Sequence, residues 1–295
     1  MAAAECVLEC ADALGECALW CTRTRRLWWV DIRAPSLQSY EPGSGEHGVY
    51  RLPGRAAGCF AVRESGGYLL ALDNTLVAYD TSTGVQQRIA DPEPGKPRNR
   101  LNDGRCDRRG RFWVGSMEVA PPGVAPGEHG SLYRVGADRT ASRMLSGLQI
   151  PNSIAFSPDD RTFYFSDTRK KLIWSFDFDI DTGDIAKRRV FADTRDHPGG
   201  PDGACVDAEG CLWSAEYRGG RVVRYTPDGS IDTVISLPVT QATSCAFGGE
   251  ALDTLYITTA RQNLTPEQLA AQPLAGALFA ARPGVRGLPE PRYCG

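Results

Sequence analysis

The chain has 295 residues, of which 42% are hydrophobic and 23% are charged, and its formal net charge is −3. These values are typical of a folded globular protein and exclude general disorder. The 33 basic and 36 acidic residues nearly balance, which argues against nucleic acid or an anionic membrane as a partner held by bulk charge. No apolar run approaches the roughly 20 residues that span a bilayer, so we expect no membrane helix.

The start of the chain and its cysteines indicate a reducing compartment. The segment from Met1 to Cys6 lacks a basic region and an apolar core, so we predict no secretion signal and a cytoplasmic location. The ten cysteines include no C-x-x-C pair, and no histidine is spaced to complete a zinc site. We expect small buried thiols rather than disulfides. Nothing in the sequence indicates an obligate protein partner.

One short pattern, a small turn followed by a bulky alternating strand, recurs six times along the chain. Its anchor residues are Leu27, Leu69, Phe112, Phe163, Leu212 and Leu255. A strand-like run precedes each anchor, and a second strand with an aromatic residue follows it. Four antiparallel strands repeated at about 45 residues predict an all-β fold, a six-bladed β-propeller. We expect one domain over residues 1–295, because a single blade cannot bury both of its faces.

Two further elements are expected near the ends of the chain. The stretch Cys6-Val7-Leu8 should pair with the last blade and close the ring as an N-terminal strand. The only helical pattern runs from Leu264 to Gln272, with Thr265 as N-cap and Pro266 at the first helical position.

The strand before each anchor is interpreted as the innermost strand of its blade, and four blades carry an oxygen-bearing side chain at one position of it. These residues are Glu16, Asn102, Asn152 and Asp202. Side chains at one phase of a radial repeat converge near its axis, so we expect these four to meet. The alternative for each of them is a local role, capping a turn and bonding nearby backbone.

Two carboxylates and two amides are hard oxygen donors, and this set suits Ca²⁺, Mg²⁺ or Mn²⁺. Without a cation the two carboxylates would repel each other, and one of them would have a raised pKa. We take one divalent cation as the expected cofactor, with Ca²⁺ as the first choice. Ligation by oxygen alone also allows Zn²⁺ and Fe²⁺.

Other residues should border this cluster. Arg100 could bind substrate hydroxyls or a carboxylate, or pair instead with Asp103 or another neighbouring carboxylate. Glu118 ends an anchor strand on the same face, so we expect it to contact the substrate. The long loops 119–130 and 261–276 should overhang the channel mouth, as lids or as surface excursions.

Other catalytic signatures are missing from the sequence. It contains no G-x-S-x-G, G-x-G-x-x-G, P-loop or H-E-x-x-H motif, and its three histidines match no triad spacing. Catalysis by a serine or cysteine nucleophile and nucleotide binding therefore have no support.

Several segments together resemble a known family. They are Asn99–Gly104, Gly110–Met117, Pro151–Asp159, Pro201–Asp207 and Leu255–Ala260. In these segments, and over nearly the whole chain, the sequence is similar to the senescence-marker-protein, gluconolactonase and luciferin-regenerating-enzyme-like family, which includes regucalcin. The resemblance implies a six-bladed propeller with one catalytic divalent cation.

Site residues follow from this resemblance by position. It implies that Glu16, Asn152 and Asp202 ligate the cation. Asn102 would bind the metal, directly or through water, or the substrate, and Arg100 would bind the substrate. The chain departs from the family pattern after the blade-five anchor strand, where Glu216 and Tyr217 could alter substrate preference.

The implied function is metal-dependent hydrolysis of a sugar lactone to the aldonic acid, a step of carbohydrate metabolism. The metal would polarise the lactone carbonyl and lower the pKa of a bound water, and Asp202 would be the general base. Arg100, Asn102 and Glu118 would hold sugar hydroxyls. One alternative is hydrolysis of aryl esters or phosphotriesters on the same metal site. Another is a non-catalytic propeller that binds Ca²⁺ or a protein partner.

Overall fold

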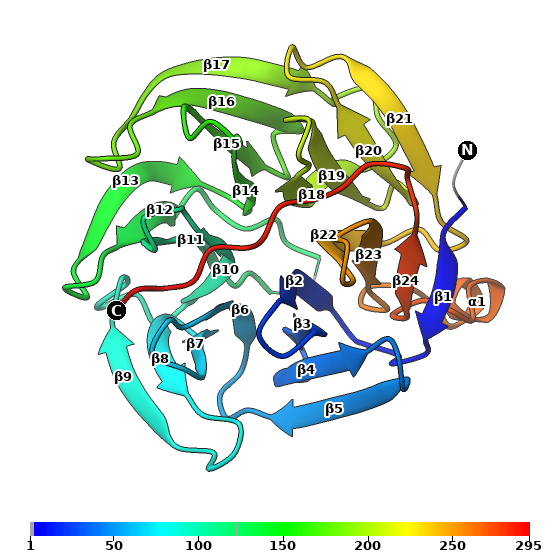
Figure 1. Ribbon diagram of the computed structural model, residues 1–295, viewed down its shortest axis with the longest axis horizontal. Helices are drawn as coiled ribbons and strands as arrows, with labels where there is room; N and C mark the ends of the chain where they lie inside the picture. Colours follow the sequence, from blue (N-terminus) through cyan, green and yellow to red (C-terminus); the bar gives the residue numbers. More distant parts are fainter. Residues whose placement is uncertain (1–2, 122) are drawn as a thin grey trace.

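Six four-stranded antiparallel sheets surround a central axis (Figure 1), which confirms the predicted six-bladed β-propeller. The computed structural model describes residues 3–121 and 123–295. Met1 and Ala2, where the predicted leaderless start lies, and Pro122, within the predicted loop 119–130, fall outside the described residues. Among the described helices, none has the length and apolar character needed to cross a membrane.

Blades one to three follow one another along the chain, each with its strands in sequence order from the axis outward (Figure 1). Blade one contains β2 (Gly15–Cys21), β3 (Arg26–Asp31), β4 (Ser36–Glu41) and β5 (Glu46–Arg51). Blade two contains β6 (Ala57–Val62), β7 (Tyr68–Leu72), β8 (Thr75–Tyr79) and β9 (Gln86–Ala90). Blade three contains β10 (Asn99–Cys106), β11 (Phe112–Glu118), β12 (Gly130–Val135) and β13 (Ala141–Leu148).

Blades four to six complete the ring, and the last of them draws on both ends of the chain. Blade four contains β14 (Pro151–Phe156), β15 (Thr162–Asp167), β16 (Leu172–Phe178) and β17 (Ile185–Asp193). Blade five contains β18 (Gly200–Val206), β19 (Leu212–Tyr217), β20 (Arg221–Tyr225) and β21 (Ile231–Ser236). Blade six contains β22 (Ala242–Gly248), β23 (Thr254–Thr259), β24 (Leu278–Ala281) and β1 (Glu5–Leu8).

The N-terminal strand closes the ring as predicted. In β1, Glu5 pairs with Ala280 and Cys6 pairs with Phe279 in an antiparallel ladder. The predicted helix is also confirmed as α1 (Pro266–Ala271), which Thr265 caps with a reciprocal capping box.

Burial explains why the anchor pattern recurs. All six anchors lie on the second strands and are fully buried: Leu27, Leu69, Phe112, Phe163, Leu212 and Leu255. They pack between adjacent blades, as where the rings of Trp113 in blade three and Phe163 in blade four have centroids 5.0 Å apart. Burying an aromatic or leucine side chain contributes about 2 kcal/mol, so the repeated anchors hold the blades together.

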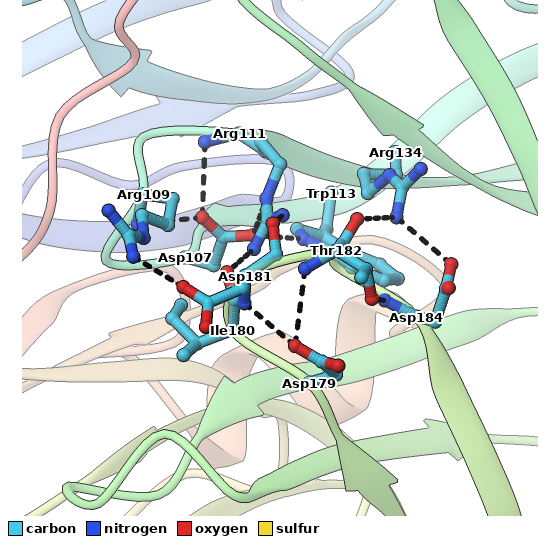
Figure 2. A network of polar contacts seen from close by, with 10 residues as sticks. All are labelled: Asp107, Arg109, Arg111, Trp113, Arg134, Asp179, Ile180, Asp181, Thr182 and Asp184. Atoms are coloured by element: carbon cyan, nitrogen blue, oxygen red, sulfur yellow. Dashed lines mark hydrogen bonds and ion pairs between the residues drawn. The ribbon is translucent and has the colours of Figure 1, made fainter.

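Polar contacts also fasten neighbouring blades, on the face where the first strand of each blade turns into the second. Figure 2 shows the turn between β16 and β17 reaching from blade four to the arginines of blade three. Arg111 donates to the carbonyl of Ile180 at 2.7 Å, and Arg134 donates to that of Thr182 at 2.7 Å. Arg109 forms an ion pair with Asp181.

The C-terminal segment crosses this same face, over the end of the central channel (Figure 1). Gly287 bridges Asp207 of blade five, and Tyr293 bridges Arg63 of blade two. Between these points, Glu290 forms an ion pair with the buried Arg105. The segment therefore covers one end of the channel, whereas the innermost strands begin at the other end.

Candidate active site

At the end where the innermost strands begin, the channel opens into a cavity of about 250 Å³. Both long loops reach it, Val119 and Pro126 from one and Gln262 and Asn263 from the other. The cavity wall also includes every site residue predicted from the sequence: Glu16, Arg100, Asn102, Glu118, Asn152 and Asp202.

A β-bulge in each innermost strand sets the direction of these side chains. The register shifts by one residue between Glu16 and Leu19 in β2 and between Asn152 and Ala155 in β14, and the four other inner strands shift at the same level. The residues after Glu16 and Asn152 adopt left-handed backbone, with φ of 55° at Cys17 and 54° at Ser153. Bulges re-aim side chains next to sites, and here they turn the polar residues toward the axis.

Glu16 and Asp202 are the two carboxylates of the cluster, and both are buried. Burial is the main cause that raises the pKa of each group well above its ordinary value. The next cause is the negative charge of Asp202 for Glu16, and that of Asp103 for Asp202. The two buried carboxyl groups thus lie close together with little positive charge or hydrogen bonding to offset their mutual repulsion. A bound cation would offset it.

The two amides lie in a chain of hydrogen bonds across blades three, four and five. Asn102 Nδ2 donates to Asn152 Oδ1 at 3.1 Å, and Asn152 Nδ2 donates to Thr168 Oγ1 at 2.7 Å. The Thr168 hydroxyl donates in turn to the carbonyl of Pro201 at 2.8 Å, next to Asp202. The predicted convergence of four inner-strand residues is therefore seen in the structure.

Arg100 is buried and does not pair with Asp103 or with any other carboxylate among the residues described. Its Nη1 donates to Asn102 Oδ1 at 2.7 Å and to the carbonyl of Leu101 at 2.9 Å. Its Nε atom is buried without a hydrogen-bond partner. Burial, followed by the charge of Arg33, lowers the pKa of Arg100 to about 10. An unpaired buried donor beside a cavity is suited to a ligand oxygen.

Comparison with known proteins agrees with this geometry. The profile of the SMP-30/Gluconolactonase/LRE-like region matches residues 14–261. The chain belongs to this family. It is 40% identical to a 6-deoxy-6-sulfogluconolactonase from Pseudomonas putida, over 99% of this chain and 98% of that protein. It is also 40% identical to an L-arabinolactonase from Azospirillum brasilense, over 96% and 93% of the two chains.

One solved structure superimposes closely on this chain. It is that of a calcium-binding protein, regucalcin, from Agrobacterium tumefaciens, which is 33% identical to this chain. The TM-score is 0.93, and the match covers 99% of this chain and 97% of the other. The same ring of blades therefore underlies both proteins.

In this SMP-30/gluconolactonase-family protein, Asp103 stabilises the backbone around the cluster. Its carboxylate accepts from the backbone N–H of Gly104 at 2.9 Å and from that of Ile154 at 3.1 Å. Ser153 Oγ likewise donates to the carbonyl of Asp202 at 2.6 Å. These bonds tie three bulged strands together at the level of the site, so they fix the positions of its side chains.

Glu118 lies in the cavity wall, with its carboxylate held at the base of a loop. Oε2 accepts from the Gly127 N–H at 3.1 Å, and Oε1 pairs with Arg98 at 3.1 Å. These contacts anchor the loop 119–130 over the cavity. Contact of Glu118 with a substrate stays a prediction.

Two polar cavity residues, Arg33 and Thr168, were not singled out from the sequence. Both belong to turns that follow second strands, and the phase argument applied to first strands passes over them. Gln262 and Asn263 come from the loop 261–276, which was expected at the channel mouth. Of the two blade-five substitutions, Tyr217 lines the cavity, whereas Glu216 is bound to His197 Nδ1 at 2.6 Å and to Arg221 Nε at 2.7 Å.

The donors in the cavity fit a hard divalent cation. In the described part of the chain, no group of three or more His, Cys, Asp or Glu side chains is arranged so that it could hold a metal ion by itself. The cluster instead combines two buried carboxylates, Glu16 and Asp202, with the amide oxygen of Asn152. The amide oxygens of Asn102 and Asn152 each accept one hydrogen bond, from Arg100 and from Asn102, and each keeps a second lone pair for a ligand. Oxygen-only ligation of this kind suits Ca²⁺ or Mg²⁺.

Proposed function

We propose that this protein is a divalent-metal-dependent lactonase, which hydrolyses a sugar lactone to the corresponding aldonic acid. One observation carries this proposal: two buried, poorly compensated carboxylates, Glu16 and Asp202, lie in an open cavity beside the unpaired donor of Arg100. Two similar proteins are named as lactonases, one of sulfogluconolactone and one of arabinolactone. The similar regucalcin is described as calcium-binding, which supports the cation.

In this proposal Glu16, Asn152 and Asp202 hold the cation. When bound, the cation polarises the lactone carbonyl and makes a neighbouring water more acidic. Asp202 accepts a proton from the attacking water as the new carbon–oxygen bond forms. The same carboxyl group then returns the proton to the ring oxygen as the carbon–oxygen bond of the ring breaks, so the first products are a carboxylic acid and an alcohol. The carboxylic acid then loses its proton to water and becomes the aldonate.

Arg100 and Asn102 orient the substrate. Arg100 has an unpaired Nε donor, and a sugar hydroxyl or the lactone oxygen would satisfy it. The Asn102 amide oxygen accepts a hydrogen bond from the Arg100 guanidinium at 2.7 Å, which fixes the position of the guanidinium. Holding the lactone in a near-attack geometry is worth several powers of ten in rate in enzymes, so both residues contribute through positioning.

One wall of the cavity supports a second substrate class. The apolar residues Met117, Val119, Val124 and Ile150 are among those that line the cavity. An aryl group fits such a surface, so aryl esters are candidate substrates for the same catalytic groups. The polar cluster favours either hydrolase over a purely structural cation site.

The test is a pH-indicator assay of lactone opening with chelated protein and with each divalent metal restored. The panel contains glucono-, galactono-, xylono- and arabinonolactone, and spontaneous hydrolysis is subtracted. We expect a rate above background that is lost on chelation and restored by at least one metal. Stoichiometric binding of metal without acceleration of any lactone would refute the lactonase proposal, and aryl esters would be tested next.

A further inference from the structure

A second arginine, Arg33, lines the same cavity as Arg100. Arg100 is buried, whereas Arg33 is exposed at the lip of the cavity. The positive charge of Arg33 is close enough to contribute to the lowered pKa of Arg100. Two guanidinium groups therefore face one cavity at different depths.

Contacts from two loops hold Arg33 in place. The buried carboxylate of Asp31 accepts from the Arg33 backbone N–H at 2.9 Å, which fixes the turn. The Arg33 side chain donates through Nε to Gln262 Oε1 at 3.2 Å. Gln262 is itself anchored, because its N–H donates to the Ala13 carbonyl at 2.9 Å and its carbonyl accepts from Gln241 Nε2 at 2.9 Å. The guanidinium is thus preorganised at the lip.

The charge of Arg33 has no partner, in contrast to those of Arg98 and Arg55 on the same face of the ring. Arg98 pairs with Glu118 at 3.1 Å, and Arg55 pairs with Asp73 at 3.4 Å. Within residues 3–121 and 123–295, Arg33 forms no ion pair, and its two Nη atoms make no hydrogen bond. Its outer donors are therefore free to bind an anion.

We propose that Arg33 binds a tetrahedral oxyanion, a sulfonate or a phosphate, at the end of the sugar lactone remote from the carbonyl. This inference rests on the proposed function and narrows its substrate class to anionic aldonolactones. The reacting carbonyl lies beside Glu16 and Asp202, so the exocyclic end of the sugar extends toward the lip. The two free Nη groups of a guanidinium match two oxygens of such an anion.

Steady-state kinetics on the metal-loaded enzyme test this assignment. The substrates are glucono-1,5-lactone and its analogues that carry a sulfonate or a phosphate on carbon 6. The variants are Arg33→Gln and, as matched control, Arg55→Gln, which removes the same charge from the same face outside the cavity. For the wild type we expect kcat/KM for at least one anionic lactone to exceed that for the neutral lactone about tenfold. The sulfonate and phosphate arms identify which oxyanion is preferred.

In Arg33→Gln we expect KM for the preferred anionic lactone to rise about tenfold while kcat is unchanged, because the lost contact binds ground state and transition state alike. The neutral lactone should be unaffected, and Arg55→Gln should behave as the wild type. Salt should raise KM for the anionic lactone in the wild type but not in Arg33→Gln.

Two results would overturn the assignment of Arg33. One is a wild type that prefers the neutral lactone over both anions, and the other is an Arg33→Gln variant that slows neutral and anionic lactones equally. In both cases turnover of the neutral lactone leaves the proposed function standing. Absence of turnover with every lactone would remove the lactonase proposal and this inference together.

Discussion

Buried carboxylates are treated differently at the two ends of the central channel. At the closed end, Asp107 and Asp207 are fully buried, and each accepts from a tryptophan indole at 2.9 Å and from an arginine Nε at 2.7 to 2.8 Å. At the cavity end, Glu16 accepts from one backbone N–H at 3.2 Å. Carboxylates that the fold satisfies stabilise their own blades, whereas those that it leaves short of donors are available to a ligand.

In two blades, the innermost strand positions both a residue of the cavity and a satisfied carboxylate of the closed end. Asn102 lies within β10 and Asp107 directly follows this strand, and Asp202 and Asp207 are placed likewise on β18. Asn102 and Asp202 lie in the bulges of these strands, at the cavity level, whereas Asp107 and Asp207 follow the strand ends at the closed end. Substitutions at the two levels should therefore separate activity from stability.

The largest expected effect is on turnover. Asp202→Ala removes the proposed base and one proposed ligand, so kcat should fall about a thousandfold or more. Lactone hydrolysis and bound metal are measured on the same sample. The control Asp184→Ala changes a carboxylate that is 71% exposed on the opposite face and should keep wild-type kcat. Near-normal turnover by Asp202→Ala with metal bound would contradict the mechanism.

Asp207→Ala should produce the opposite phenotype. It leaves Trp213 Nε1 and the buried Arg224 without their shared acceptor, so the free energy of unfolding should fall by about 3 kcal/mol. Urea denaturation measures the loss, while kcat per folded molecule should change little. Asp181→Ala, at a side chain that is 73% exposed, is the control and should cost less than about 1 kcal/mol. A variant as stable as the wild type would show that the closed-end network does not stabilise its blade.

The sequence predicts the ring and the cluster because both depend on periodicity. Anchors such as Phe112 and Phe163 recur because each blade must bury the same face, so the blade number and the innermost strand follow from spacing alone. Glu16, Asn102, Asn152 and Asp202 share one phase of that repeat, so their convergence also follows.

Contacts between particular loops are not periodic, and the sequence does not reveal them. The pairing of Glu118 with Arg98 and the hydrogen bond from Arg33 to Gln262 both depend on how those loops meet. The bulges do recur in every innermost strand, but the polar and apolar pattern of the sequence does not show the extra residue. One local signal for the bulges exists in Gly203, the residue after Asp202. A Cβ atom there would lie 2.6 Å from Ser244 Oγ, so only glycine allows the inner strands to approach this closely.

Asp12 combines features of both kinds of buried carboxylate, because it has hydrogen-bond donors and also a raised pKa. It should therefore make the stability of the protein depend on pH. Its carboxylate accepts from Trp29 at 2.7 Å and from Gln38 at 2.6 Å, yet burial raises its pKa to about 6. A raised folded pKa means that the folded state binds the proton more tightly. Stability should therefore decrease by up to about 3 kcal/mol as pH rises from about 4 to about 6.

Urea denaturation across that pH range measures the effect of Asp12. In Asp12→Asn the position no longer titrates, so the decrease between pH 4 and pH 6 should shrink by this amount. Asp80→Asn, at an exposed carboxylate whose pKa is lowered by Ser82, is the control and should keep the decrease. An unchanged profile in Asp12→Asn would assign the pH dependence to other groups.

The smallest effect that we predict for the two ends of the channel is stabilisation by the cation. The gain in the free energy of unfolding is compared between a closed-end variant and a cavity variant. A cation that binds only the folded protein, at about one hundred times its Kd, should add about 2.7 kcal/mol to the free energy of unfolding of chelated protein. Asp207→Ala should keep this gain although it starts from a lower stability, because its carboxylate is not a proposed ligand. Asp202→Ala should lose it, since a proposed ligand is gone. An equal gain in both variants would place the cation outside the cavity, and the poorly compensated carboxylates would then need another explanation.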